Sequence, residues 1–264
     1  MLVRLAPTSR SLTIETDDER IDRYVQTAYG NVLAYTTTQA TDAAVFLTGS
    51  FPATVSFNGV AWTRERSGPG VNPWQSDAYV IDQFVWCALA GDADWMPLYA
   101  CAVVVDGRAL LLVGESGVGK TTLGLALHRL GARVIGDEMI VIRRHDCTVD
   151  AIDRRLSVRQ ERGDPLRAGD NGVLAVDRRL FGGVPETGKL AATFVVTRGD
   201  EARVAPASVG RTALAIASRL GARPKNLDDV GDLVGILETG RCFTLTLGEP
   251  NASARAVLEA LGAC

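Results

Sequence analysis

Gly114-Glu115-Ser116-Gly117-Val118-Gly119-Lys120-Thr121 is the stretch that decides the fold of this 264-residue chain. It fits the spacing GxxxxGK(S/T), in which two glycines, a lysine and a hydroxyl residue must coincide. The chain holds only three lysines, Lys120, Lys189 and Lys225. A chance match in a chain of this length and composition is therefore expected only about 0.005 times. The stretch predicts a phosphate-binding loop.

The flanking residues place this loop between a strand and a helix. An apolar run at 108–113 precedes it, residues 122–130 have helical spacing, and Gly131 can end the helix. The glycines let backbone N–H groups converge on phosphate oxygens, and the helix start adds its positive dipole end. Lys120 is expected to reach the β and γ phosphates, and the Thr121 hydroxyl to ligate Mg²⁺. ATP and Mg²⁺ are the predicted cofactors, with contacts from Gly114, Glu115, Ser116, Gly117, Val118, Gly119, Lys120, Thr121 and Thr122.

Two adjacent carboxylates follow the loop. Asp137-Glu138 begins 17 residues after Lys120, at the end of the next predicted strand, residues 133–135. This short spacing predicts that the strand before the loop and the strand before the carboxylates are adjacent. One carboxylate can then hold Mg²⁺ while the other takes a proton from an attacking hydroxyl. The plainer alternative is a pair that only caps a turn.

Two other classes of protein with such a loop lack support in the sequence. A transporter-type ATPase would carry an LSGGQ-like segment, and this sequence has none. A GTPase would carry an NKxD-like segment that recognises the base. Asn226-Leu227-Asp228-Asp229 lacks the lysine and does not follow a predicted strand. Neither class is therefore favoured.

The loop and the segment Gly131-Ala132-Arg133-Val134-Ile135-Gly136-Asp137-Glu138 together resemble the catalytic domain of HPr kinase/phosphorylase. They resemble more closely the stand-alone kinases related to it, some of which phosphorylate a serine on ribosomal peptides. The close similarity covers residues 98–143, and a weaker one covers 189–198 and 242–261. This resemblance implies a P-loop kinase core of the phosphoenolpyruvate-carboxykinase-like type, with a mixed sheet.

The resemblance also implies roles for single residues. Asp137 is the expected general base for a serine hydroxyl, and Glu138, where the family usually has a second Asp, helps Thr121 to hold Mg²⁺. The family commonly has a His shortly before the loop strand, where this chain has Tyr99. A tyrosine is neutral near pH 7, because its ordinary pKa is about 10. Kinase activity without the reverse phosphorolysis is therefore expected.

Basic residues outside these motifs are further candidates for contacts to phosphate. Ser157-Val158-Arg159 faintly resembles a Ser-Leu-Lys stretch of the stand-alone kinases, which implies that Arg159 contacts the transferring phosphoryl group. Residues 143–167 hold seven arginines among acidic neighbours, so a solvated, ion-paired face is the plainer interpretation of that segment. Lys189 follows Gly188 and opens a predicted strand, from which it could approach phosphate.

Composition and sequence patterns argue against several classes of protein. The 28 Lys and Arg against 31 Asp and Glu give a net charge of −3, which argues against a nucleic-acid binder that relies on positive charge. The apolar runs are much shorter than the ~18 residues of a membrane helix, and residues 1–12 lack a signal-peptide pattern. The five cysteines form no CxxC pair, so neither a zinc site nor a disulfide framework is expected. A cytoplasmic location is the expectation.

The elements expected along the chain give an α/β protein in two parts. Asn58-Gly59 predicts a hairpin of strands 53–57 and 60–64, and Asp106-Gly107 predicts another of strands 100–105 and 108–113. Proline and glycine predict a loop at 66–74. Further elements are expected as helices 76–90, 209–220 and 252–261 and as strands 139–143, 190–197 and 242–247. The predicted domains are a small β-rich region, residues 1–75, and a catalytic domain, residues 76–264.

The function that these features predict is a kinase that uses Mg²⁺-ATP and transfers the γ-phosphate to a hydroxyl. The expected acceptor is a serine of a peptide or small protein, with no nucleic-acid or membrane partner. A small molecule with a hydroxyl is an alternative acceptor. A nucleotide-binding regulator without useful turnover is the rival, favoured by Tyr99 and Glu138. The sequence leaves open the base preference and the oligomeric state, a homo-oligomer included.

Overall fold

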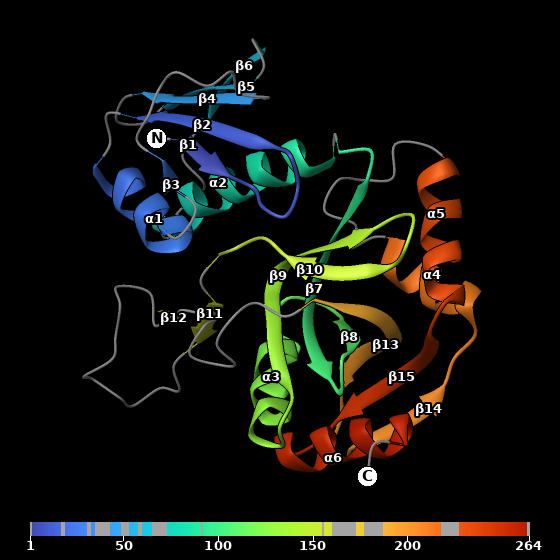
Figure 1. Cartoon of the computed structure of the whole chain (residues 1–264). Helices are drawn as coiled ribbons and strands as arrows, with labels where there is room; N and C mark the ends of the chain where they lie inside the picture. Colours follow the sequence, from blue (N-terminus) through green and yellow to red (C-terminus); the bar gives the residue numbers. More distant parts are fainter. Residues whose placement is uncertain are drawn as a thin grey trace. The chain divides into compact units, whose positions relative to one another are not determined.

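The described residues of the computed structural model form two compact units (Figure 1). One unit comprises Met1–Ala93 with Asp153–Arg155, and the other comprises Asp94–Ile152 with Leu156–Cys264. The division therefore lies at residues 93 and 94, whereas the sequence predicted it near residue 75. The described residues are 2–16, 19–30, 33–34, 43–48, 53–57, 60–64, 73–90, 92–154, 156–159, 173–176, 187–217 and 227–262.

The amino-terminal unit is a six-stranded sheet with two helices, in the strand order β3-β1-β2-β4-β5-β6. The predicted hairpin is found as β5 paired antiparallel with β6, with Phe57 opposite Val60. The unit also contains helix α2, because α2 packs against α1 and β2. Most of the predicted loop 66–74 lies outside the described residues. The elements are β1 Leu2–Arg4, β2 Ser11–Thr16, α1 Glu19–Tyr29, β3 Leu33–Ala34, β4 Ala43–Thr48, β5 Ala53–Phe57, β6 Val60–Arg64 and α2 Pro73–Ala90.

The second unit is built on a mixed seven-stranded sheet with the order β10-β9-β7-β8-β13-β15-β14. Strand β13 runs parallel to both β8 and β15, and β7 runs antiparallel to both β8 and β9. A separate pair, β11 and β12, completes the described strands of this unit. The strands are β7 Trp95–Val105, β8 Arg108–Val113, β9 Arg133–Arg143, β10 Thr148–Ala151, β11 Leu156–Arg159, β12 Val173–Val176, β13 Gly188–Arg198, β14 Arg203–Pro206 and β15 Arg241–Leu247.

Helices cover both faces of this sheet and give three layers. Alternate residues of β7 face opposite ways, so Cys101 belongs to one core and Ala100 and Ala102 belong to the other. The core around Cys101 is closed by α3 Lys120–Arg129 and α6 Pro250–Leu261. The opposite core is closed by α4 Val209–Ala217 and α5 Leu227–Glu238. The mixed α/β architecture expected from the sequence is therefore present.

The hairpin of β7 and β8 confirms the turn predicted at Asp106-Gly107. Both residues have positive φ, 49° at Asp106 and 72° at Gly107. Positive φ at both central positions is what a two-residue type I′ turn requires. The turn fixes the register, in which Val105 lies opposite Arg108 and Cys101 lies opposite Leu112.

Strands β8 and β9 are not adjacent, so the predicted adjacency was wrong. Strand β7 lies between them, with Cys101 opposite Leu112 of β8 on one side and opposite Asp137 of β9 on the other. The connection through α3 therefore passes over β7, against which α3 packs. Asp137 lies inside one continuous strand, residues 133–143, rather than after a short strand that ends at residue 135. Two strand spacings of about 4.8 Å separate the backbones of β8 and β9.

Gly136, immediately before the carboxylate pair, is required by close packing of β9 against β10. A Cβ atom at Gly136 would lie 2.3 Å from the Ala151 Cβ and 3.4 Å from the Ile140 Cδ1. Gly136→Ala should lower the free energy of unfolding by about 1–3 kcal/mol, because the two strands must move apart. Chemical denaturation is the measurement.

The matched control for Gly136 is Gly235→Ala in α5, where nothing lies within 4 Å of an added Cβ. The free energy of unfolding of this control should rise by about 0.5–1 kcal/mol, since alanine has a higher helix propensity than glycine. Equal unfolding midpoints for Gly136→Ala and the native protein would contradict the packing argument.

Candidate functional site

The loop Gly114–Thr121 connects β8 to α3 and depends on its glycines. A Cβ at Gly114 would lie 2.7 Å from the Val196 carbonyl oxygen. Gly117 and Gly119 have φ of 76° and 118°, which side chains disfavour. Helix α3 begins at Lys120, directly after Gly119. The geometry is the strand–loop–helix that the sequence predicted.

Lys120 folds back over this loop. Its Nζ donates hydrogen bonds to the carbonyl oxygens of Gly114 at 3.0 Å and Glu115 at 2.9 Å. The same Nζ lies 4.4 Å from the centre of the Tyr99 ring, a cation–π contact. The Lys120 side chain is only 4% exposed. Tyr99 thus contacts the loop lysine through its ring face.

Asp137 is joined to the loop through Thr121. The Thr121 Oγ1 donates a hydrogen bond to the Asp137 Oδ2 at 2.5 Å, so β9 and the start of α3 meet at this pair. The other carboxylate oxygen, Oδ1, is buried and has no hydrogen-bond partner among the described residues. Asp137 is 8% exposed. Thr121 therefore holds one oxygen of this carboxylate, and the other oxygen is buried without a hydrogen-bond partner among the described residues.

Burial raises the pKa of Asp137 to about 6. The hydrogen bond from Thr121 and the positive charge of Lys120 lower this pKa, and the negative charge of Glu138 raises it, but desolvation has the largest effect. A carboxyl with a pKa near 6 is mostly ionised at pH 7.5 and is more basic than an exposed aspartate. Strongly shifted carboxyls of this kind occur at functional sites.

Glu138 has an unusual backbone conformation. Its φ is 67°, in the left-handed region that costs a residue other than glycine about 1–2 kcal/mol. Strain of this kind gathers at functional positions. Glu138 is half-buried and follows Asp137 directly in β9. Its assignment as a metal-holding residue stays a prediction.

The pKa of Asp137 predicts how stability changes with pH in the ligand-free protein. The ordinary value of 3.8 applies to the unfolded chain and about 6 to the folded protein. Between these two values the folded protein retains a proton that the unfolded chain has lost. The contribution of this carboxyl to stability is therefore largest below about pH 4, falls as the pH rises and is lost above about pH 6. Relative to Asp137→Asn, the native protein should lose up to about 3 kcal/mol of unfolding free energy between pH 4 and pH 7.5. Denaturant titrations across this range test the prediction, and parallel pH profiles for the two proteins would contradict it.

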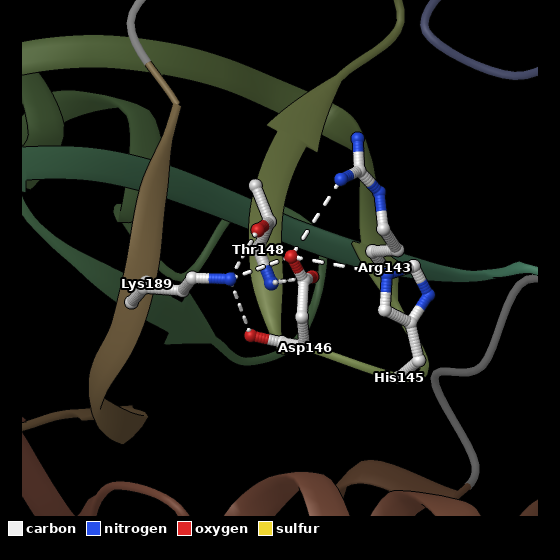
Figure 2. A network of polar contacts seen from close by, with 5 residues as sticks. All are labelled: Arg143, His145, Asp146, Thr148 and Lys189. Atoms are coloured by element: carbon white, nitrogen blue, oxygen red, sulfur yellow. Dashed lines mark hydrogen bonds and ion pairs between the residues drawn. The ribbon is translucent and has the colours of Figure 1, made fainter.

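Lys189 does not lie at the loop, so the prediction that it could approach phosphate was wrong. It pairs with Arg108 at the beginning of β8, whereas the loop follows the other end of that strand. Its Nζ lies 2.6 Å from an Asp146 carboxylate oxygen and donates to the Asp146 carbonyl and the Thr148 hydroxyl, both at 2.9 Å (Figure 2). The hydrogen bond from Lys189 holds the pKa of Asp146 well below its usual range.

The arginine-rich segment forms ion pairs where its side chains are described. Arg143 lies 3.6 Å from Asp146, and Arg144 pairs with Asp229 and Asp232 of α5. These contacts agree with the plainer interpretation for Arg143 and Arg144, whereas Arg154 of the same segment is buried rather than solvated. Arg159 is the last residue of β11, and its side chain lies outside the described part of the structure. Its role in phosphoryl transfer stays a prediction.

Arg154 belongs to the amino-terminal unit and is 7% exposed there. Its Nη2 donates to the Tyr24 hydroxyl and to the Asp82 Oδ2, both at 2.9 Å. The hydroxyls of Tyr24 and Tyr29 donate to the Asp82 Oδ1 at 2.9 and 2.6 Å. Burial first, and then the Asp82 charge, raise the pKa of both tyrosines, so both act as donors. This network is a structural feature of the amino-terminal unit.

Arg198 is a residue at the loop that the sequence reasoning did not single out. It ends β13, and its Nη2 and Nε donate to the carbonyl oxygens of Gly117 at 3.0 Å and Val118 at 3.3 Å. No signal in the sequence marked it, because only the parallel pairing of β13 with β8 brings the end of β13 to the loop, at the edge where ligands of such sheets bind.

The residues present fit a magnesium ion only as one part of a nucleotide complex. No group of three or more His, Cys, Asp or Glu side chains that could hold a metal occurs among the described residues. Mg²⁺ in kinases is commonly held by one or two protein groups together with substrate phosphates. Thr121 and the half-buried Glu138 supply oxygen atoms of the required kind. In the described part of the chain, no helix is both long and apolar enough to cross a bilayer.

Comparisons with known proteins give a distant similarity. No protein-family model matches the chain, and no curated protein does. Among solved structures, the Hpr(Ser) kinase/phosphatase from Coxiella burnetii is similar over 62% of this chain and 95% of that chain, with 13% identity and a TM-score of 0.35. The strand order and layers described above establish a mixed α/β protein by themselves, and the solved kinase/phosphatase is a distant neighbour of it.

Proposed function

We propose that the chain is a kinase that transfers the γ-phosphate of Mg²⁺-ATP to a hydroxyl group. The observation that carries this proposal is the hydrogen bond from Thr121 to Asp137, which brings a buried carboxylate to the glycine loop. The local sequence resemblance to serine kinases favours a serine of a peptide or small protein as acceptor. The loop amides and Lys120 bind the phosphates in this proposal.

Nucleotide binding changes the contacts of Lys120. Without ligand, its ammonium group is satisfied by the carbonyl oxygens of Gly114 and Glu115. Phosphate oxygens of ATP replace one or both carbonyls as acceptors, and the exchange strengthens the bonds because the new acceptors are charged. The Tyr99 ring, whose centre lies 4.4 Å from the Lys120 Nζ, stays beside the ammonium group during this exchange.

Asp137 serves as the proton acceptor in the proposed reaction. Thr121 holds its Oδ2, which leaves the buried Oδ1 to accept the proton of the acceptor hydroxyl. The hydroxyl oxygen forms a bond to the γ-phosphorus, the bond from that phosphorus to the β–γ bridging oxygen breaks, and ADP leaves. A base with a pKa near 6 is suited to this step at neutral pH.

Thr121 and Glu138 would hold Mg²⁺, with phosphate oxygens completing its ligand set. The ion, when bound, neutralises charge on the phosphates. Arg159 remains our candidate for contacting the transferring phosphoryl group, on the resemblance alone. A regulator that binds ATP without turnover is the second candidate, because Tyr99 and Glu138 depart from the family pattern.

The test of the proposed function is incubation of the protein with Mg²⁺-ATP and candidate acceptors. The acceptors are serine-containing peptides, small proteins and small-molecule alcohols. A mass increase of one phosphate group on an acceptor supports the kinase. ATP binding with no transfer to any acceptor favours the regulator, and absence of ATP binding contradicts both candidates.

A further inference from the structure

A pocket of about 320 Å³ lies beside the glycine loop, on the side away from Asp137. Its walls include Val118 of the loop, Thr122 of α3, Arg198 and Gly199 at the end of β13, and Leu247 and Gly248 at the end of β15. All of these residues belong to the second unit. Apart from the loop residues and Thr122, the residues that line this pocket have no role in the mechanism proposed above.

The sheet order places this pocket and Asp137 on opposite sides of the loop. From β9 the order runs through β7 and β8 to β13 and β15, and the loop follows β8. Asp137 lies on β9, whereas the pocket lies at the carboxyl ends of β13 and β15. An extended ligand whose phosphates bind the loop therefore points one end toward Asp137 and the other toward the pocket.

The pocket walls suit a flat aromatic group. Val118 and Leu247 supply apolar surface. A Cβ at Gly199 would lie 2.3 Å from the Thr246 Cγ2, so the position needs glycine and contributes only backbone to the wall. The Arg198 guanidinium, held by the Gly117 and Val118 carbonyls, brings a planar cation that stacks well on aromatic rings.

We infer that this pocket binds the base and ribose of the nucleotide, with Arg198 as a binding residue and the γ-phosphate directed toward Asp137. The inference rests on the proposed function for the phosphate end of the ligand. The pocket volume is at the low end of the roughly 300–1,000 Å³ of small-ligand pockets. That size suits a base and sugar whose phosphates lie outside, on the loop.

The test compares Mg²⁺-ATP with inorganic tripolyphosphate, which has the phosphates but no base or sugar. Isothermal calorimetry gives the ratio of the two dissociation constants for each protein. The native protein should bind ATP at least about 10-fold more tightly than tripolyphosphate, because only ATP has a base that can stack on Arg198 and contact the apolar walls. Thr122→Phe should fill the pocket and Arg198→Ala should remove the planar cation, and both should bring the ratio close to one.

The ratio separates a base pocket from damage to the loop. Arg211→Ala is the matched control, because Arg211 is exposed on α4, which covers the other face of the sheet. It should keep the native ratio. An unchanged ratio in both Thr122→Phe and Arg198→Ala, whatever the absolute affinities, would show that the base binds elsewhere and overturn the inference. Failure of the native protein to bind either ligand would instead overturn the proposed function.

Discussion

Lys120→Ala should lower the affinity for Mg²⁺-ATP about 100-fold. Lys120 supplies a buried cation at the loop, and two charge-assisted hydrogen bonds to phosphate are together worth about 3 kcal/mol. The alanine variant keeps the glycines and the start of α3, so residual weak binding through backbone amides is expected. Calorimetric titration with Mg²⁺-ATP measures the change.

Lys189→Ala is the control, because it removes the same kind of side chain from the other end of the parallel strands β8 and β13. Lys189 is 62% exposed and pairs with Asp146. Its loss should leave ATP affinity within about twofold, because Lys189 lies at the end of β8 away from the loop and an exposed ion pair contributes at most about 1 kcal/mol to stability. Unchanged ATP affinity in Lys120→Ala would refute the assignment of the loop.

Asp137→Asn should abolish most phosphoryl transfer while ATP still binds. The amide can accept the Thr121 hydrogen bond in place of Oδ2, but it cannot take a proton from the acceptor hydroxyl. Loss of a general base typically slows a reaction about 10²–10⁴-fold. Single-turnover transfer, measured with saturating Mg²⁺-ATP and an acceptor that the native protein phosphorylates, gives the rate.

Glu138→Gln distinguishes the two carboxylates. If Glu138 holds the ion, this variant should need more Mg²⁺ for half-maximal transfer and should recover much of its rate at high Mg²⁺. Asp137→Asn should not recover at any Mg²⁺ concentration. The reverse pattern would assign the proton to Glu138 and the ion to Asp137.

The glycine loop was predictable from the sequence because its function fixes both residue types and spacing. The two hairpins were predictable for a similar reason, since Asn-Gly and Asp-Gly favour the tight turns that strands of this twist require. In both cases the determining interactions are local. The structure confirms strand β8, helix α3 and the turn at Asp106-Gly107.

Features that depend on strand order could not be predicted from the sequence. The spacing between Lys120 and Asp137 fits adjacent strands. In the sheet, however, β7 lies between β8 and β9, although it precedes both of these strands in the chain. Similarly, Lys189 opens a strand beside β8, but only the register shows that it lies at the end away from the loop. Arg198 becomes a loop residue for the same reason, at the other end of β13.

The observed division at residues 93 and 94 differs from the predicted one because the prediction relied on local composition. The proline-rich and glycine-rich segment before it resembles a linker, although α2 packs with α1 and β2 of the amino-terminal unit. A short return segment, Asp153–Arg155, also belongs to this unit. Local composition contains no signal for such a return.

That return segment has a consequence for the order in which the chain folds during synthesis. Arg154 follows its partner Asp82 by 72 residues, and all of β7, β8, β9 and β10 are translated between them. At a synthesis rate of about 5–20 residues per second, Arg154 is added to the chain roughly 4–14 seconds after Asp82. The amino-terminal unit, although it leaves the ribosome first, is therefore finished only after most of the sheet that carries the glycine loop has been made.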